Sequence, residues 1–331
     1  LSWFRSLGLV WRAADDSGLL YPYSNKASSV LDVLLAACKR WGVTVVPEFR
    51  AQAVVRIGTG FSIQGERGIE QERTKTARGR IKRTLIWEPA EFKAGKVVVA
   101  VGGSVAKDLV PGHVVHPLSG VLAPLATEME AIRGLSGVRA HVRARLMRDG
   151  RLLFEEEGEV LFRDYGVSGI VSFNASRHTH PGDVLELDLA PDYDLHSLID
   201  LLMFLAHSLE ATSADELLGG MFVPEFANCI IGKAQLSAAK PDEEAIIKLA
   251  SAIKCFSLAV DGVYEDGVPQ VSRGGCDVGE VNPSTLESKL TDGLFVLGEA
   301  LDVDGPCGGY NLDWAWTCGI LAGKAIARTL R

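Results

Sequence analysis

A carboxylate and a pair of glycines follow an apolar run near the carboxyl end of the sequence. Glu299 comes directly after Leu294–Gly298, and Gly308-Gly309 follow on what we expect to be one glycine-rich loop. A carboxylate at the end of a buried strand lies where α/β sheets place their ligands, and it can accept hydrogen bonds from sugar-type hydroxyls. Glycines let a ligand approach the backbone closely. These residue types therefore predict a binding site for a hydroxyl-bearing ligand.

A helix that we expect to begin near Asn311 completes this pattern. The first N–H groups of a helix and the positive end of its dipole favour negative charge on a ligand, by on the order of 1 kcal/mol. The alternative is an ordinary strand–glycine–helix turn that holds no ligand. Two acidic residues among the glycines, Asp302 and Asp304, favour the ligand site.

The elements that position these residues come from both ends of the chain. Near the carboxyl end we expect a strand at 294–297, the loop, and a helix at 312–330. Near the amino end, apolar residues at helical spacing predict a helix that ends at Gly42, with a strand at 43–46 after it. The apolar run 96–101 ends in Gly102-Gly103 and is typical of a strand buried on both faces. These expected helices and buried strands together predict an α/β domain.

The middle of the chain has a different pattern of apolar and polar residues. Between Val138 and Leu146 apolar residues alternate with basic ones, and Asp149-Gly150 then predicts a hairpin turn. From Leu195 to about Ala252 the apolar spacing becomes helical. The predicted organisation is a discontinuous domain of residues 1–112 plus 273–331, a β-barrel-like subdomain of residues 113–190 and a mainly helical subdomain of residues 191–272.

Several long strings resemble one known family. They are GGCDVGEVNPSTLESK (274–289), GLFVLGEALDVDGPCGGYNLDWAW (293–316), GEVLFRDYGVSGI (158–170), LLYPYSNKASSVLDV (19–33) and VVVAVGGS (97–104). The chain resembles the YhiN/BaiN-like (aminoacetone oxidase-like) family of FAD-dependent oxidoreductases over nearly its whole length. The resemblance implies an α/β fold, with a Rossmann-like FAD-binding domain and inserted β-barrel-like and helical subdomains.

The resemblance also implies a set of cofactor-binding residues. Gly298 and Glu299 would contact the ribityl chain of FAD. The residues along the flavin ring would be Gly308, Gly309, Tyr310, Asn311 and Leu312, where the helix start favours the negative charge of a reduced flavin. Those beside the diphosphate would be Val101, Gly102 and Gly103, and Val54 would meet the adenine through its backbone.

Two departures from the family stand out. Members open with a strand–GxGxxG–helix unit and a GGGRCN segment, and the first residues of this chain align after both. Members also carry a glycine-rich stretch after the VVVAVGGS-type strand, where this chain runs almost directly from Ser104 into Gly112-His113. The sequence thus predicts an enzyme that moves a hydride between FAD and a small organic substrate, with oxygen or NAD(P)H as the electron partner. The alternative is a non-catalytic remnant or scaffold that has lost FAD. No catalytic acid or base can be assigned.

Composition narrows the remaining function classes. The net charge of -8 would repel phosphate backbones, so we expect no nucleic-acid partner, although the basic run 73–83 points the other way. No apolar run is long enough to cross a membrane.

Six scattered cysteines without metal-type spacing predict free thiols in the cytoplasm. We expect no metal site and interpret the histidines as surface loop residues; those considered are His113, His116, His178 and His180. The sequence leaves the oligomeric state open.

Overall fold

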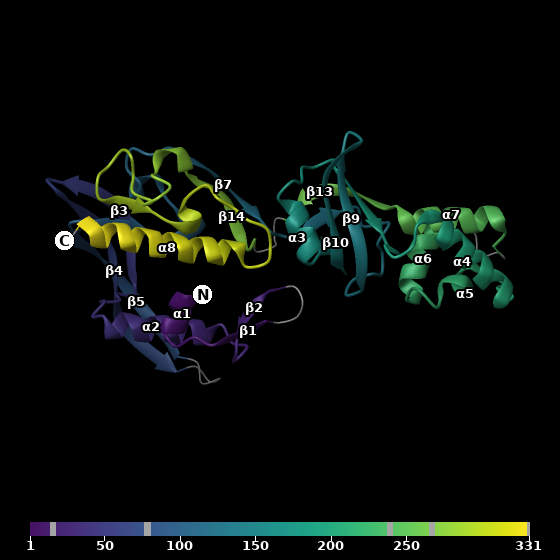
Figure 1. Cartoon of the computed structure of the whole chain (residues 1–331), viewed down its shortest axis with the longest axis horizontal. Coiled ribbons are helices and arrows are strands. Elements are labelled where there is room, and N and C mark those ends of the chain that lie inside the picture. The colour runs from purple at the N-terminus through teal and green to yellow at the C-terminus, as the bar shows by residue number, and fades with distance from the viewer. Residues whose placement is uncertain (14–17, 76–80, 237–240, 265–268, 330–331) are drawn as a thin grey trace. The chain divides into compact units, whose positions relative to one another are not determined.

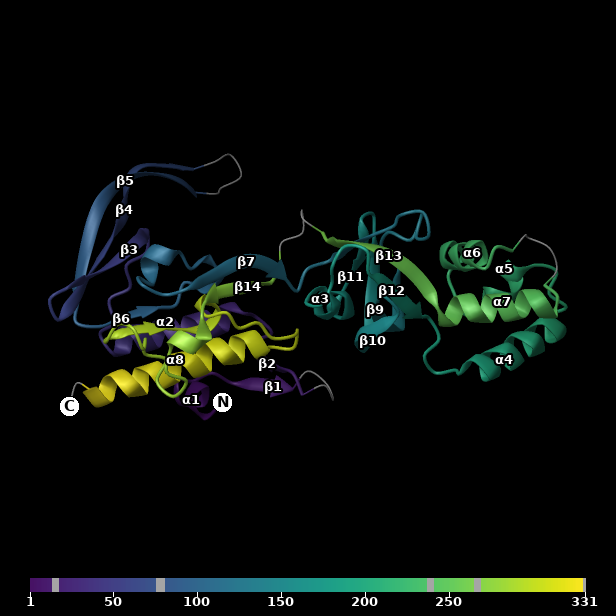
Figure 2. The ribbon, with the colours of Figure 1, turned by 90° about the horizontal axis from the view of Figure 1, so that it is seen from above.

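The computed structural model describes residues 1–13, 18–75, 81–236, 241–264 and 269–329. They form two compact units, whose ribbons are shown in Figures 1 and 2. The first unit consists of Leu1–Pro117, Gly274–Val303 and Gly308–Arg331, and the second of Leu118–Arg273 and Asp304–Cys307. The mixed α/β architecture expected from the sequence, with a β-barrel and helices inserted, is confirmed.

A short parallel sheet lies at the centre of the first unit. Strands β6 (Val97–Val99) and β15 (Leu294–Val296) pair in parallel, with Phe295 opposite Val98. All three residues of β15 are fully buried. Because parallel strands point the same way, the carboxyl ends of β6 and β15 meet at one edge of the sheet. Both apolar runs identified in the sequence are therefore strands, and they are neighbours.

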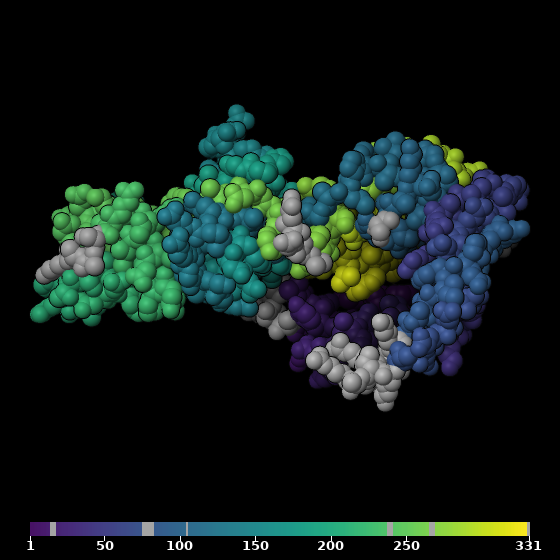
Figure 3. All heavy atoms as spheres, turned by 180° about the vertical axis from the view of Figure 1, so that it is seen from behind, coloured from purple at the N-terminus to yellow at the C-terminus, as the bar shows by residue number. Residues whose placement is uncertain are grey.

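Helix α8 (Tyr310–Thr329) packs in the same core, and it is the yellow helix of Figure 1. Its residues Cys318 and Ala322 are buried with the side chains of β15. A three-stranded antiparallel sheet adds Val54 and Phe61 to this core. Its strands, in the order β3-β4-β5, are β3 (Phe49–Ile57), β4 (Gly60–Lys75) and β5 (Ile81–Ala94). The space-filling view shows this sheet on the surface of the first unit (Figure 3). Residues 76–80 of the basic run lie outside the described part of the chain.

The remaining elements of the first unit are short, apart from one helix. They are α1 (Ser2–Ser6), β1 (Trp11–Ala13), β2 (Leu20–Pro22), α2 (Ser28–Arg40) and the 3-10 turns η1 (Gly102–Ser104), η2 (Lys107–Leu109), η3 (Val278–Glu280) and η4 (Gly298–Ala300). Strands β7 (Val115–Val121) and β14 (Val271–Cys276), each with residues in both units, pair as a further two-stranded sheet.

The amino-terminal helix and strand prediction is half right. Helix α2 forms, but Ala37 is its one buried residue, and Leu31 on its apolar face is 56% exposed. Residues 43–46 are not a strand, and Val43 and Val45 are exposed. The preference of valine for strands reflects packing and pairing with a neighbour rather than the backbone alone. Among the described residues, no strand pairs with this segment.

The second unit contains a closed six-stranded barrel. In order around the barrel, its strands are β10 (Arg151–Arg163), β11 (Gly166–Ser168), β8 (Leu125–Thr127), β13 (Phe256–Val263), β12 (Val184–Asp188) and β9 (Arg139–Arg148). Strand β9 alternates as the sequence predicts, since Val142, Ala144 and Leu146 are fully buried. Asp149 and Gly150 both have positive φ, as a tight hairpin turn between paired strands requires.

In its described part, the same unit has five helices. They are α3 (Ile170–Ser176), α4 (Leu195–Ser208), α5 (Ala214–Leu218), α6 (Pro224–Lys233) and α7 (Glu243–Lys254). Asp194 and Asp242 cap α4 and α7, because their carboxylates accept hydrogen bonds from the Ser197 and Ala245 N–H groups, each at 2.8 Å. Leu198 of α4 and Phe256 of β13 belong to one continuous apolar core, so the helices and the barrel pack as one body.

Candidate cofactor site

Two turns follow the parallel strands at the same edge of the sheet. The Leu297 N–H donates to the Val99 carbonyl at 2.9 Å, which extends the pairing of β6 and β15 by one hydrogen bond. Immediately beyond, η1 and η4 are neighbours. The structure thus brings the Val101–Gly103 segment beside Gly298 and Glu299, as a common cofactor site requires.

Gly298 joins this edge to helix α8. The Trp314 indole N–H donates to the Gly298 carbonyl at 3.1 Å. Gly298 has φ +61°, and a Cβ there would lie 3.5 Å from the Cα of Ala315. The turn η4 therefore lies against the first turns of α8. Trp314, which is partly buried against the core of the first unit, thus also holds this turn.

The start of α8 carries the residues expected along the flavin. Gly308 and Gly309 have φ +120° and +87°, and the Asp313 N–H donates to the Gly309 carbonyl at 2.9 Å to close the first helical turn. Tyr310 and Leu312 are 62% and 58% exposed. The helix therefore begins directly after the glycine pair, and two of its first side chains face open space.

The backbone at Gly102 and at Gly309 is not covered by neighbouring atoms. A Cβ built at Gly102 or at Gly309 would have no neighbouring atom within 4 Å. Bare backbone beside a helix start suits a planar or phosphorylated ligand, which needs close contact with N–H groups. The residues present thus fit the flavin side of FAD.

Val54 lies elsewhere in the first unit. It is buried on β3, where it pairs with Ile63, and its side chain shares a core with Val99 and Leu297. Outside its own sheet, strand β3 packs beside η2. The contact of Val54 with adenine stays a prediction that rests on the family resemblance.

The two acidic residues of the glycine loop have internal partners. Asp302 accepts a hydrogen bond from the Gly274 N–H at 2.9 Å. Asp304, in the second unit, accepts hydrogen bonds from Arg177 Nε at 2.7 Å and Arg273 Nε at 2.8 Å. Burial alone raises the pKa of the Asp304 carboxyl, but the hydrogen bonds from Arg273 and Arg177 outweigh it and hold that pKa below its ordinary value. Both carboxylates are thus accounted for without a ligand.

Sequence reasoning missed these two arginines. Arg177 lies 127 residues from Asp304 and Arg273 lies 31 residues away, and neither stands in a motif. Only the chain topology places them around one carboxylate.

The histidines differ in their surroundings. His116 is half-exposed, and its Nε2 lies 3.0 Å from Asp277 Oδ2 in a hydrogen bond that raises the pKa of His116. His178 stacks on Phe154, and burial lowers the pKa of His178. The interpretation as surface loop residues is wrong for His113, which is only 2% exposed. Its loop folds inward, with the His113 N–H donating to the Val110 carbonyl at 3.1 Å.

A cavity of about 470 Å³ lies within the second unit. Its size is that of small-molecule sites. Its lining combines Arg139 and His141 of β9 with apolar side chains. These include Leu201 of α4, Phe226 of α6, and Met221 and Phe222 in the turn between α5 and α6. None of the predicted cofactor-binding residues lines this cavity.

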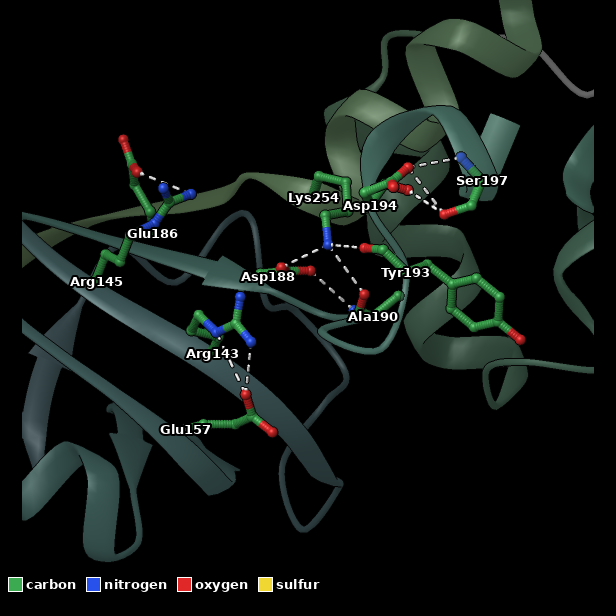
Figure 4. A network of polar contacts seen from close by, with 10 residues as sticks. All are labelled: Arg143, Arg145, Glu157, Glu186, Asp188, Ala190, Tyr193, Asp194, Ser197 and Lys254. Atoms are coloured by element: carbon green, nitrogen blue, oxygen red, sulfur yellow. Dashed lines mark hydrogen bonds and ion pairs between the residues drawn. The ribbon is translucent and has the colours of Figure 1, made fainter. Parts of the chain in front are cut away.

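Lys254 does not line the cavity, but it binds the backbone of Ala190 and Tyr193, which do, in the polar network of Figure 4. Its ammonium group donates to Asp188 Oδ2 at 2.6 Å, to the Ala190 carbonyl at 3.0 Å and to the Tyr193 carbonyl. Asp188 Oδ1 in turn accepts from the Ala190 N–H at 3.1 Å. Asp188 is buried, so this carboxylate depends on Lys254 for its charge partner.

Comparison with known proteins gives the class of this chain. Residues 1–325 match the HI0933-like protein Rossmann domain family, and the chain belongs to that family. The resemblance drawn from the motifs and the Rossmann-like fold class are thereby confirmed.

Two relatives are enzymes with stated activities. The chain is 29% identical to the 3-dehydro-bile acid delta(4,6)-reductase of Clostridium scindens, over 99% of this chain and 79% of that protein. It is 25% identical to the ribosomal RNA dihydrouridine synthase of Escherichia coli, over 88% of this chain and 70% of that protein. The chain therefore belongs to a Rossmann-type flavoprotein family whose relatives are oxidoreductases. Within the described residues, no helix has both the length and the apolar character needed to cross a membrane.

Proposed function

We propose that this protein is a FAD-dependent reductase that acts on a carbon–carbon double bond conjugated to a carbonyl in a small organic substrate. One observation carries the proposal: two glycine turns at the edge of a parallel strand pair lie beside the first turns of a long helix. When bound, FAD would supply the hydride for the reduction.

The residues of the first unit would divide the cofactor among them. The Glu299 carboxylate, next to Gly298, would accept hydrogen bonds from ribityl hydroxyls. The start of α8, from Gly308 to Leu312, would lie along the flavin ring, where the helix dipole favours negative charge on the reduced pyrimidine side. Val101–Gly103 would lie beside the diphosphate, and Val54 would contact the adenine through its backbone.

The substrate class follows from what the relatives' names share. A delta(4,6)-reductase and a dihydrouridine synthase both saturate a carbon–carbon double bond conjugated to a carbonyl group. The net charge of -8 favours a small molecule over ribosomal RNA as the substrate. We propose NAD(P)H as the electron donor. Because the sequence shows no second dinucleotide fingerprint, the nicotinamide would have to reach the flavin face directly.

A reconstitution experiment tests the proposal. The full chain is incubated with FAD, separated from free cofactor and examined for the two absorption bands of a bound flavin. NADH or NADPH is then added without oxygen, followed by a 3-oxo-Δ4 steroid or by ribosomal RNA. We expect bleaching by the nicotinamide and recovery of the bands with the steroid. Recovery with RNA alone would replace the small-molecule substrate by the nucleic acid.

Two variants test whether Glu299 takes part in FAD binding. Glu299→Gln should weaken FAD binding several-fold, because a carboxylate accepts stronger hydrogen bonds than an amide. Glu88→Gln, at an exposed position on β5 of the same unit, is the matched control. A protein that stays colourless with excess FAD would support the non-catalytic remnant instead.

A further inference from the structure

Three potential metal ligands converge in the first unit, and one of them, Cys276, is bridged through its backbone to the glycine loop at Leu301. One imidazole nitrogen of His113, the thiol of Cys276 and a carboxylate oxygen of Glu280 lie within 4.8 Å of one another. His113 and Cys276 are 2% and 0% exposed, and Glu280 is half-buried. Nitrogen, sulfur and oxygen donors that meet in a buried place are uncommon unless something binds them together.

His113 is held in the form that a metal ligand needs. Its Nδ1 lies 3.2 Å from the Pro111 carbonyl, so the ring proton belongs on Nδ1 and the lone pair on Nε2. Metal-binding histidines usually donate their other ring N–H to such a carbonyl. Nε2 is buried, and it has no hydrogen-bond partner among the described residues. A buried, unpartnered acceptor is unfavourable, and a bound cation would satisfy it.

The two segments that carry the ligands are fixed to each other by backbone contacts. Glu280 Oε2 accepts a hydrogen bond from the Val114 N–H at 2.8 Å, and the Asp277 N–H donates to the Val114 carbonyl at 3.0 Å. The Cys276 carbonyl accepts from the Asp302 N–H at 2.9 Å. The loop of His113 and the β14–η3 stretch are therefore held in register before any ion binds.

The donor set selects among metals. Magnesium and calcium prefer oxygen ligands, whereas zinc accepts histidine nitrogen, thiolate and carboxylate in a tetrahedral arrangement. Ligand atoms around zinc lie about 3.5 Å apart for bonds of about 2.0–2.3 Å. The three donors would thus need to close by about 1 Å, which side-chain rotation can supply. Water would complete the fourth position.

We propose that His113, Cys276 and Glu280 form a zinc site that links the loop before β7 to the β14–η3 segment. The site would join these two chain segments within the first unit. The proposal is independent of the proposed reductase activity, because it requires neither FAD nor substrate.

Cobalt substitution tests this site directly. The metal-free full chain, kept reduced, is titrated with Co²⁺ and then with Zn²⁺. We expect saturation at one equivalent, with a sulfur-to-cobalt charge-transfer band in the near ultraviolet and d–d bands of tetrahedral intensity. Zinc should abolish both bands and raise the melting temperature.

Substitutions assign the ligands. His113→Ala and Cys276→Ser should each weaken Co²⁺ binding at least tenfold, and Cys276→Ser should remove the charge-transfer band. Cys255→Ser and His207→Ala, at exposed positions in the second unit, are the matched controls and should bind like the unmodified protein. Far-ultraviolet circular dichroism checks that each variant is folded.

Two results would overturn the site. Cobalt bound to the unmodified protein without a charge-transfer band excludes thiolate ligation, and this measurement needs no variant. Unchanged affinity and stoichiometry in folded Cys276→Ser would assign the binding to other residues.

Discussion

The Trp314 indole N–H donates to the Gly298 carbonyl at 3.1 Å, and this hydrogen bond links the first turns of α8 to the end of strand β15. Gly298 precedes Glu299, so Trp314 also orients the residue that we assign to the ribityl chain. A positioning role of this kind can be tested without altering any group that would touch the cofactor.

Trp314→Phe keeps the ring in the core and removes the hydrogen bond. A typical intramolecular hydrogen bond contributes about 1 kcal/mol, so FAD affinity should fall about fivefold. Fluorescence titration of FAD measures this change, and Trp316→Phe on the same helix is the control. Equal affinities in the two variants would rule out the positioning role.

Gly298→Ala tests the backbone of the turn. With φ +61°, a side chain at this position is strained even though its Cβ would find ordinary contacts at 3.5 Å. We expect the free energy of unfolding, measured with urea, to fall by about 1–2 kcal/mol. Gly319→Ala lies inside α8 with open space around its Cβ, and it should instead stabilise by about 1 kcal/mol. The idea fails if both substitutions change stability in the same direction.

Asp304→Asn tests the carboxylate that two arginines share. Its pKa is held below the ordinary value, so its stabilising effect is complete at neutral pH and is lost as the pH falls through the lowered pKa. At neutral pH the variant should be less stable by about 2–3 kcal/mol. The difference from the unmodified protein should shrink in acid. Asp261→Asn, at an exposed position, is the control and should change the free energy of unfolding at neutral pH by less than about 0.5 kcal/mol. A gap that is constant with pH would contradict this account.

Lys254→Met tests the buried ion pair of Figure 4. The side chains of Lys254 and Asp188 are 18% and 7% exposed, so removal of the lysine leaves a buried charge without its partner. We expect a loss of about 3 kcal/mol in unfolding free energy, partly restored when Asp188→Asn is added. Lys248→Met breaks the exposed pair with Glu244 on the same helix and should cost less than about 1 kcal/mol. Similar losses for both lysines would show that burial does not matter here.

Local patterns predicted the strand at 294–297, the helix that follows its loop and the Asp149-Gly150 hairpin, because each depends on apolar spacing and turn residues close together in the chain. The strand at 43–46 failed because a strand needs a partner that its own residues do not specify. His113 and Asp304 were misjudged for a related reason: residues that lie near them in the fold, Cys276 and Arg177, are distant in the sequence. The placement of the eleven predicted cofactor residues against FAD, Val54 among them, stays a prediction that the binding experiments above test.

The closed order of the six-stranded barrel bears on how this protein would aggregate. A strand ladder that returns to its starting strand presents no row of free amide and carbonyl groups to another molecule. The short parallel pair β6–β15 and the three-stranded sheet of the first unit do not close in this way. Under mild heating, intermolecular sheet formation should therefore start from the first unit, while the barrel keeps its native amide protection in hydrogen exchange.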